Sequence, residues 1–353
     1  MSLADLGWDA TFEDGWSRVS KPGLVPGRVT AGHTRVFRVA TADGELLAEV
    51  AGQLRHSTRG REDLPAVGDW VALRPRAGER RALIRAVVPR RTAFIRRAAG
   101  KRAVAQVLAA NVDTVFLIMG LDRDFNLRRL ERALILASES RVEPVVLLNK
   151  ADLCPEVEAR RREAERTAPG VPVLVVAAKE GRGLGALAPW LTRGRTVALL
   201  GSSGVGKSTL VNRLLGEERL RTREVRPSDQ RGRHTTTHRE LVPLPGGALL
   251  IDTPGLREVQ LWAGEEGLAS AFGELERLAA ACRFRDCSHG AEPGCAVRAA
   301  VEAGEVPEER LASYHKLRAE LRSLEVREDL ELQRRQKQEW RTIHRAQRKH
   351  QPR

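Results

Sequence analysis

Hydrophobic positions change their spacing several times along this chain, and each change predicts a different kind of structure. Between residues 25 and 97 the apolar residues form short β-rich runs separated by turn residues. An Asp-Gly pair between two such runs is a strong signal for a β-hairpin. About five short strands in this spacing predict a small barrel, and an OB-fold is the natural candidate. The clearest elements are Thr34–Val39, the turn Asp43–Gly44, Glu45–Val50, Val67–Leu73 and Ala82–Val88.

From about residue 103 to 262, apolar runs of strand length alternate with helical patterns. This alternation predicts an α/β domain with a mostly parallel sheet. After the first run, apolar residues recur at helical spacing from Leu127 to Ala137, behind Asn126 as a helix cap. The predicted strands are Asp113–Met119, Pro144–Leu148, Val173–Val176, Val197–Leu200 and Ala248–Ile251.

The two ends of the chain carry weaker patterns. The first residues show no clear period, so we expect a loosely attached leader. Beyond Asp252 the sequence becomes helical and mixed in charge. The predicted organisation is a leader (1–24), an OB-fold domain (25–98), an α/β domain (103–262), a helical domain (263–331) and a basic tail (332–353).

The composition suggests a charged binding partner and argues against a membrane-spanning segment. The chain has 353 residues, 42% of them hydrophobic, and no apolar run of membrane-spanning length. The net charge of +14 suggests a polyanionic partner. However, 52 of the 60 basic residues are arginine, a ratio that codon bias alone can produce. The tail 332–353 holds eight basic residues against Glu339, and both a solvated tail and RNA contact fit this imbalance.

A glycine-rich loop between an apolar strand and a helical run is the most informative stretch for function. It follows Thr196–Leu200 and precedes Leu210–Leu215, which is the setting of a G-x-x-x-x-G-K-[ST] phosphate loop. Glycines let consecutive backbone N–H groups turn toward an anion, and the following helix adds its positive N-terminal dipole. Lys207 would reach the β- and γ-phosphates, and the Ser208 hydroxyl would hold Mg²⁺. The predicted nucleotide-binding residues here are Gly201, Ser202, Ser203, Gly204, Val205, Gly206, Lys207, Ser208 and Thr209.

A second motif predicts that the bound base is guanine. The sequence Asn149-Lys150-Ala151-Asp152 ends an apolar strand, where ligands of open α/β sheets bind. The Asp152 carboxylate can accept from the N1–H and exocyclic amine of guanine, a pattern that adenine cannot supply. Asn149 can address the O6/N7 edge, and the stem of Lys150 can lie along the ring. At the next strand end, Ala177 and Ala178 resemble the weaker motif whose backbone closes over guanine.

Asp252-Thr253-Pro254-Gly255 ends a further strand and predicts the metal and γ-phosphate side of the site. Asp252 is the expected carboxylate near Mg²⁺, and the Gly255 N–H can meet the γ-phosphate. The polar segment 231–238 before it has the character of a mobile switch. Thr236 is the favoured Mg²⁺ ligand in that segment, with its two neighbouring threonines as alternatives.

Two further features concern the order of the motifs and the hydrolysis step. The guanine motif precedes the phosphate loop, whereas ordinary GTPases have the reverse order, so the domain is circularly permuted. Leu256 stands where many GTPases carry a water-orienting glutamine. We therefore expect His234 to orient the water, unless this histidine only packs or caps.

Three cysteines and one histidine lie within fourteen positions near the end of the chain. They are Cys282, Cys287, His289 and Cys295. Three thiolates and one imidazole make a complete tetrahedral set for one structural zinc ion, with no position left for water. Reduced cysteines without a metal are the alternative interpretation. Clustered cysteines also fit a reducing cytosol better than disulfides do.

With these motifs in hand, the chain resembles the bacterial family of ribosome small-subunit-dependent GTPases, RsgA, also called YjeQ. The resemblance implies a cytoplasmic factor in late maturation of the small (30S) ribosomal subunit, with contacts to rRNA and a GTPase activity that the subunit stimulates. It also implies that a hydrophobic residue replaces the usual glutamine and that the switch histidine, His234, takes part in hydrolysis. The elements that carry it are Leu64–Asp69, Asn149–Asp152, Gly201–Thr209, Gly232–Thr237, Asp252–Gly255 and the Cys282/Cys287/His289/Cys295 set.

We therefore expect a Mg²⁺-dependent GTP hydrolase that acts as a monomer away from membranes. Its catalytic residues would be Lys207, His234 and Gly255, its Mg²⁺ would be held by Ser208, Thr236 and Asp252, and its partners would be GTP or GDP, rRNA and the small subunit. One alternative is a permuted GTPase that serves the large subunit. A second is an rRNA-binding scaffold in which the nucleotide is only structural.

Overall fold

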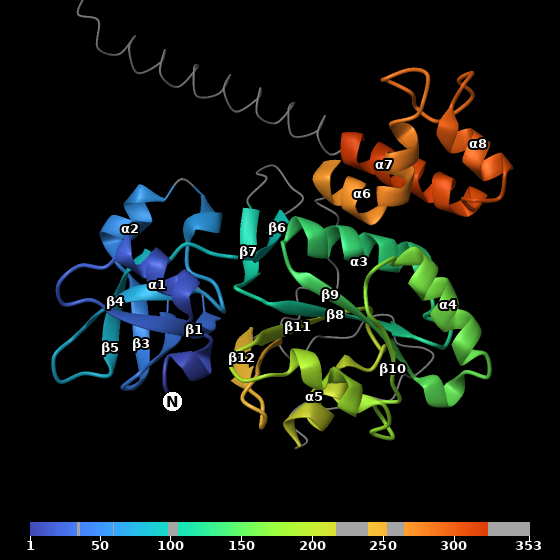
Figure 1. Ribbon diagram of the computed structural model, residues 1–353. Helices are drawn as coiled ribbons and strands as arrows, with labels where there is room; N and C mark the ends of the chain where they lie inside the picture. Colours follow the sequence, from blue (N-terminus) through green and yellow to red (C-terminus); the bar gives the residue numbers. More distant parts are fainter. Residues whose placement is uncertain (34–35, 59, 98–104, 217–238, 253–264, 324–353) are drawn as a thin grey trace, which may run out of the picture. The chain divides into compact units, whose positions relative to one another are not determined.

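The computed structural model describes residues 1–33, 36–58, 60–97, 105–216, 239–252 and 265–323. They belong to two compact units, drawn in Figure 1. The first unit comprises residues 1–96 and 106–260, and the second comprises 97–105 and 261–353. Among the described residues, no helix combines the length and the apolar character needed to cross a membrane.

A closed β-barrel forms the first part of the first unit. Adjacent strands pair antiparallel, except that β3 and β5 run parallel, and β4 pairs back onto β1 to close the ring. Val29, Leu73 and Ile84 are fully buried in its interior. This confirms the predicted barrel and fits an OB-fold. The strands are β1 (Val25–His33), β2 (Val36–Thr41), β3 (Gly44–Val50), β4 (Trp70–Pro75) and β5 (Arg81–Val87), with helix α2 (Gly52–Ser57) after β3.

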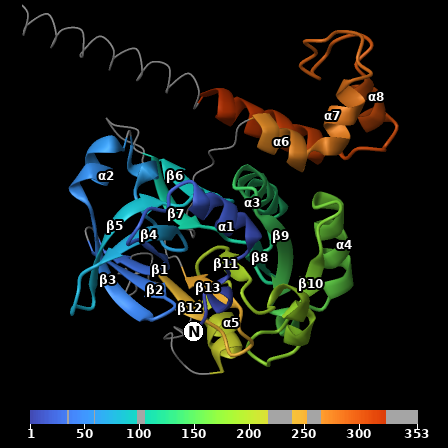
Figure 2. The ribbon, with the colours of Figure 1, turned by 60° about the vertical axis from the view of Figure 1, so that its left-hand side comes forward.

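A six-stranded sheet flanked by helices forms the rest of the first unit. Its order is β10-β9-β8-β11-β13-β12, with parallel pairing except for β12. All seven residues of β8 are buried, which explains why this strand reads as a continuous apolar run. Helices α3 and α4 lie on one side of the sheet and α5 on the other (Figures 1 and 2).

These elements confirm the predicted α/β alternation. The strands are β8 (Thr114–Gly120), β9 (Glu143–Asn149), β10 (Val173–Val175), β11 (Thr196–Leu200), β12 (Glu240–Pro243) and β13 (Leu249–Asp252). The helices are α3 (Leu127–Glu139), α4 (Val157–Thr167) and α5 (Lys207–Leu215). Asn126 caps α3 as predicted, because its Oδ1 accepts from the Arg129 N–H at 3.1 Å.

The barrel and the GTPase sheet share one continuous ladder of strands. Strand β12 pairs with β13 on one side and with barrel strand β1 on the other, through Ala31 and Glu240. The Arg38 guanidinium on β2 also forms an ion pair with the Glu240 carboxylate. A separate two-stranded sheet, β6 (Ala93–Arg97) and β7 (Ala105–Ala110), stands between barrel and GTPase sheet in the sequence. The pattern of the sequence did not predict β6, β7 or β12.

The expectation of a loosely attached leader is wrong. Residues 4–17 form the 3₁₀-helix η1 (Ala4–Leu6) and helix α1 (Ala10–Ser17). Leu6 and Phe12 are each only 1% exposed and pack with the fully buried Trp70 of β4. Burying one such side chain stabilises a protein by about 2–3 kcal/mol. The apolar residues show no period because they are divided between two helices too short to display one.

One buried guanidinium joins three segments of the first unit. Arg28 on β1 is 1% exposed and donates to three backbone carbonyls: those of Leu6 in the leader, Gly68 in the loop before β4 (3.2 Å) and Asn111 after β7 (3.1 Å). Burial lowers the pKa of Arg28 to about 10. Because this side chain bonds the leader, the barrel and the GTPase segment at once, it fixes their mutual position within the unit.

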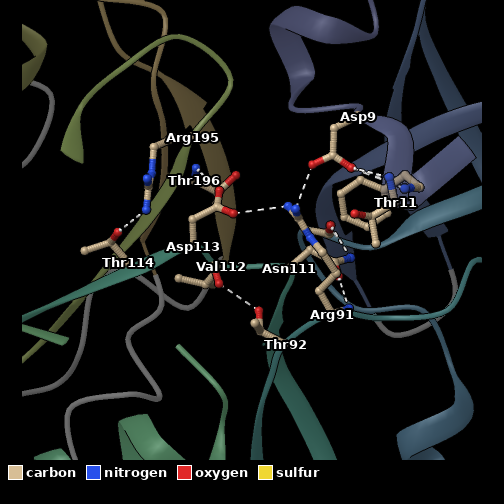
Figure 3. Close-up of polar contacts among 12 residues, drawn as sticks. Asp9, Thr11, Arg91, Thr92, Asn111, Val112, Asp113, Thr114, Arg195 and Thr196 are labelled. Carbon is tan, nitrogen blue, oxygen red and sulfur yellow. Dashed lines mark hydrogen bonds and ion pairs between the residues drawn. The ribbon is translucent and has the colours of Figure 1, made fainter. Parts of the chain in front are cut away.

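A second set of polar contacts links the leader to the GTPase segment nearer the surface (Figure 3). The Arg91 guanidinium forms ion pairs with Asp9 of the leader (2.7 Å) and Asp113 just before β8 (3.1 Å). The Arg91 backbone N–H also donates to Asn111 Oδ1 (3.0 Å), and Asp113 accepts from the Thr196 N–H (2.7 Å) at the start of β11. These contacts lie at the amino ends of β8 and β11, the sheet edge opposite the phosphate loop.

The second unit is helical. It contains α6 (Glu265–Ala271), α7 (Gly273–Ala279), α8 (Ala296–Glu302) and helical residues 308–323. Phe272, Leu275 and Val297 are buried at its centre. The loop between α7 and α8 carries the cysteine and histidine cluster described below.

Candidate nucleotide site and metal centre

The phosphate loop lies between β11 and α5, as the sequence predicts. Its backbone is packed against neighbouring strand ends: a Cβ on Gly201 would lie 2.5 Å from the Ile118 carbonyl oxygen. A Cβ on Gly206, which has a φ of +103°, would lie 2.3 Å from Nδ2 of Asn149. Side chains are therefore excluded at both positions by contact with β8 and β9, and the loop is held close to the guanine motif.

The Lys207 ammonium bonds to the first residues of this loop. Its Nζ donates to the carbonyl oxygens of Gly201 (2.7 Å) and Ser202. Ser208 and Thr209 follow on the first turn of α5 and are half-buried, whereas Ser203 and Gly204 are exposed. This places a lysine, two hydroxyls and a helix N-terminus around one loop, the set that phosphate binding requires.

Asn149 connects the phosphate loop with the two parts of the guanine motif. Its side chain is 3% exposed; Nδ2 donates to the Val205 carbonyl (2.8 Å), and Oδ1 accepts from the Ala178 N–H (3.0 Å). Its own carbonyl accepts from the Leu121 N–H (2.7 Å). Both atoms of the amide thus bond to protein, and the expected contact of Asn149 with the O6/N7 edge stays a prediction.

The remaining residues of the guanine motif lie around Asn149. Lys150 adopts a φ of +64°, which is uncommon for a residue other than glycine and is over-represented at functional sites. Ala151 and the half-buried Asp152 lie in the 3₁₀-turn η3 (Ala151–Leu153), and Ala177 and Ala178 are each 1% exposed. The structure therefore brings the three predicted sequence segments together at the carboxyl edge of the sheet.

Asp252 is the described member of the metal and γ-phosphate motif. It is half-buried and ends β13, the strand next to β11, so it lies at the same sheet edge as the phosphate loop. His234, Thr236, Gly255 and Leu256 lie outside the described residues. Their assigned roles stay predictions.

Three polar residues of this site were missed by sequence reasoning. Arg213 of α5 donates to the carbonyls of Ala178 (3.3 Å) and Lys179, and thereby fixes the loop after β10. Asp122 and Asp124 follow β8 and contact Lys150 and Ser202. The position of these carboxylates directly after a buried strand was the available signal.

The candidate metal centre lies in the second unit. The Cys282 Sγ is 3.7 Å from His289 Nδ1 and 3.9 Å from Cys295 Sγ, and Cys295 Sγ is 3.6 Å from His289 Nδ1. Together with Cys287 Sγ, all four donor atoms lie within 4.8 Å of one another. Metal–donor bonds of about 2.0–2.3 Å in a tetrahedron place the donors roughly 3.5–3.8 Å apart. Cys282, His289 and Cys295 therefore have the spacing of ligands to one tetrahedral metal ion, and Cys287 lies close enough to be the fourth. Thiolates are the donors that soft metal ions prefer.

Local electrostatics also suit a cation at this point. Burial raises the pKa of Cys287 to about 11, and the neighbouring thiols of Cys295 and Cys282 act in the same direction. Burial also opposes ionisation of Cys282, but hydrogen bonds from the backbone N–H groups of Val297 and Ala296 and from the thiols of Cys287 and Cys295 together lower that pKa. Burial lowers the pKa of His289, which favours the neutral imidazole that can bind a metal. A cation would relieve the repulsion among three thiolates held this closely.

Comparison with known proteins identifies the family. A model of the family described as RsgA GTPase matches residues 87–262. A relative from Opitutus terrae, named small ribosomal subunit biogenesis GTPase RsgA, is 51% identical over 357 residues, covering 99% of this chain and 97% of the relative. The chain belongs to the RsgA GTPase family. A relative of the same name from Streptomyces avermitilis is 46% identical, over 96% of this chain and 90% of that protein.

Two solved structures have the same fold. YjeQ from Thermotoga maritima is 28% identical with a TM-score of 0.65, covering 84% of this chain and 98% of YjeQ. YloQ, described as a circularly permuted GTPase, is 22% identical with a TM-score of 0.62, covering 85% of this chain and 96% of YloQ. The chain is therefore a circularly permuted GTPase, as the order of its motifs predicts. As a member of the RsgA GTPase family, it hydrolyses GTP.

Proposed function

We propose that this chain hydrolyses GTP as a factor in the late maturation of the small ribosomal subunit. The relatives that match nearly its whole length are named for biogenesis of that subunit. The structural observation that carries the proposal is the amide of Asn149, which joins Val205 of the phosphate loop to Ala178 beside the guanine motif. A phosphate-binding loop and a guanine-selective motif held by one side chain form a site for a guanine nucleotide.

The proposed site performs phosphoryl transfer mainly by positioning and charge stabilisation. Lys207 binds the β- and γ-phosphates, and the Asp152 carboxylate accepts from guanine. Ser208, Thr236 and Asp252 hold Mg²⁺, which neutralises charge on the phosphate oxygens when it is bound. The Gly255 N–H donates to the γ-phosphate. Each residue thus holds a part of the substrate in place, and none needs to form a covalent bond.

The proposed catalytic histidine explains why the partner controls the rate. Leu256 offers neither a donor nor an acceptor to the attacking water, so His234 of the switch segment orients that water. A switch that is ordered by the small subunit would bring His234 into place only on the ribosome. The activity is then low in isolation and rises when the subunit binds.

The second unit supplies a zinc-stabilised basic surface in this proposal. Cys282, Cys287, His289 and Cys295 hold one structural zinc, because their donor atoms fit a closed tetrahedral set. The loop that they bracket carries Arg283 and Arg285, whose charges suit contact with rRNA. The protein would act in the cytoplasm, where the subunit matures.

Binding to purified small subunits tests this proposal against a scaffold in which the nucleotide is only structural. We expect the subunit to bind the protein loaded with a non-hydrolysable GTP analogue at least about tenfold more tightly than the protein loaded with GDP. Equal affinities for the two nucleotide states would support the scaffold instead. Tighter binding to large subunits than to small ones would contradict the assignment to the small subunit.

A further inference from the structure

We propose that Asp122 and Asp124, on the turn that follows β8, are positioning residues of the nucleotide site. Asp122 fixes Lys150 of the guanine motif, and Asp124 fixes Ser202 of the phosphate loop. This inference rests on the proposed nucleotide site and adds two carboxylates that act through other residues. Neither aspartate belongs to a motif that the sequence analysis used.

Asp122 forms a close ion pair with Lys150. The distance from Asp122 Oδ2 to Lys150 Nζ is 2.6 Å, and the two side chains are 30% and 23% exposed. Partial burial raises the pKa of Asp122, but the hydrogen bond and charge of Lys150, together with the backbone N–H of Asp124, outweigh it. The pKa is therefore lowered, and the carboxylate is charged at neutral pH. The other oxygen, Oδ1, accepts from the Asp124 N–H at 3.0 Å. The carboxylate is therefore held by the backbone of its own turn and can hold Lys150 in one direction.

The direction of Lys150 matters because its stem is expected to lie along the guanine ring. A lysine side chain has many rotamers in solution, and ordering it opposes ligand binding. The ion pair with Asp122 selects one of these rotamers before the nucleotide arrives. The turn itself is fixed to the motif, since the Leu121 N–H donates to the Asn149 carbonyl at 2.7 Å.

Asp124 acts on the phosphate loop from the same turn. One carboxylate oxygen accepts from the Ser202 hydroxyl, and the other forms an ion pair with Arg129 at 2.8 Å. The Ser202 carbonyl in turn accepts from Lys207. Asp124 thus stabilises the part of the loop that orients the phosphate-binding lysine, while Arg129 offsets a negative charge that would otherwise repel phosphate.

Nucleotide binding to Asp122→Asn tests the proposal. The amide keeps the shape of the carboxylate and removes its charge. We expect the dissociation constants of fluorescent GDP and of a GTP analogue both to rise about fivefold, as loss of a partly buried ion pair implies. The kcat at saturating GTP stays within about twofold, because the reacting atoms are untouched.

Glu143→Gln is the matched control. Glu143 begins β9 and pairs with Arg195 at 2.7 Å, at the opposite edge of the same sheet. Removing the charge of Glu143 should leave the dissociation constants of GDP and of the GTP analogue within about twofold of those of the original chain. If Glu143→Gln weakens binding as much as Asp122→Asn does, the effect is general loosening of the sheet and the proposal is wrong.

A double variant shows whether Asp122 acts through Lys150. Lys150→Met weakens nucleotide binding by itself, and adding Asp122→Asn to it should cause no further loss. Likewise Asp124→Asn should weaken binding in the original chain but have no effect when Ser202 is already alanine. Effects that add in full would overturn the positioning role. If the unaltered chain binds no guanine nucleotide, the proposed site itself fails, and this inference fails with it.

Discussion

The amide of Asn149, bonded to Val205 on one side and Ala178 on the other, shows what single residues contribute to this site. From the sequence, its position at a strand end could be predicted because β9 reads as an apolar run. Its partners could not be predicted, since both lie 29 or more residues away in the chain. The same limit applies to Asp122 and Arg213, whose roles depend on which loops meet at the sheet edge.

Replacing Asn149 with alanine should affect both folding and binding. The substitution leaves the buried Val205 carbonyl and Ala178 N–H without their partner, which costs about 2–3 kcal/mol of the free energy of unfolding. We also expect GDP binding to weaken by more than about tenfold, since two loops of the site separate. Urea denaturation and fluorescent-GDP titration measure the two effects.

Asn126→Ala is the control for this variant. It removes the cap of α3 and should cost about 1 kcal/mol without changing the affinity for GDP. Intact GDP affinity in Asn149→Ala would show that the amide does not organise the site.

His234→Ala tests the hydrolysis step. We expect turnover stimulated by the small subunit to fall about a hundredfold, the usual contribution of a residue that handles water in the transition state. The affinity for GTP should stay within a few-fold, because His234 is not expected to hold the ground state. The nearby His238→Ala serves as the control and should retain stimulated turnover. Stimulated turnover that is unchanged in His234→Ala would remove this residue from the mechanism.

At the scale of elements, the leader departs most from expectation. Its helices are short, and their apolar residues reveal a pattern only in the folded protein, where they pack on Trp70. The strands β8, β9 and β11 were predictable because buried parallel strands consist of continuous apolar residues. Strand β12 has only four residues and forms a hairpin with β13, for which the Gly246–Gly247 turn was a local signal that sequence reasoning did not use. Its pairing with β1, more than two hundred positions earlier, has no such local signal.

Phe12→Ala measures how firmly the leader is attached. The side chain is 1% exposed, and its removal should lower the free energy of unfolding by about 3 kcal/mol through lost burial and a residual cavity. Thr11→Ala, at an exposed neighbouring position, should change it by less than about 0.5 kcal/mol. Equal urea midpoints for the two variants would show that the leader is only loosely attached.

The loop between α7 and α8, which carries the cysteine and histidine cluster, makes a prediction about metal content. We expect elemental analysis of the purified chain to give about one zinc per molecule, and Cys287→Ser to lose it, because the closed set then lacks a thiolate. Cys154→Ser removes a cysteine outside the cluster and should retain the metal. Zinc that is absent from the original chain, or retained in full by Cys287→Ser, would contradict a structural site at these residues.

At the scale of the whole molecule, the order of the motifs decides the class of GTPase. The guanine motif comes before the phosphate loop in sequence, yet both reach the carboxyl edge of one sheet through β9 and β11. Sequence could predict this arrangement because each motif follows an apolar strand. It could not predict that barrel and GTPase sheet form one ladder of eleven strands, since that depends on pairing between distant edges.

GTP turnover with purified ribosomal subunits is the most direct test of the central claim. The protein alone should hydrolyse GTP slowly and ATP not at all, because Asp152 selects guanine. Small subunits should raise the rate for GTP by about a hundredfold or more, as partner-supplied ordering does in other GTPases, and large subunits should not. Equal hydrolysis of ATP, or a rate that small subunits leave unchanged, would contradict the account.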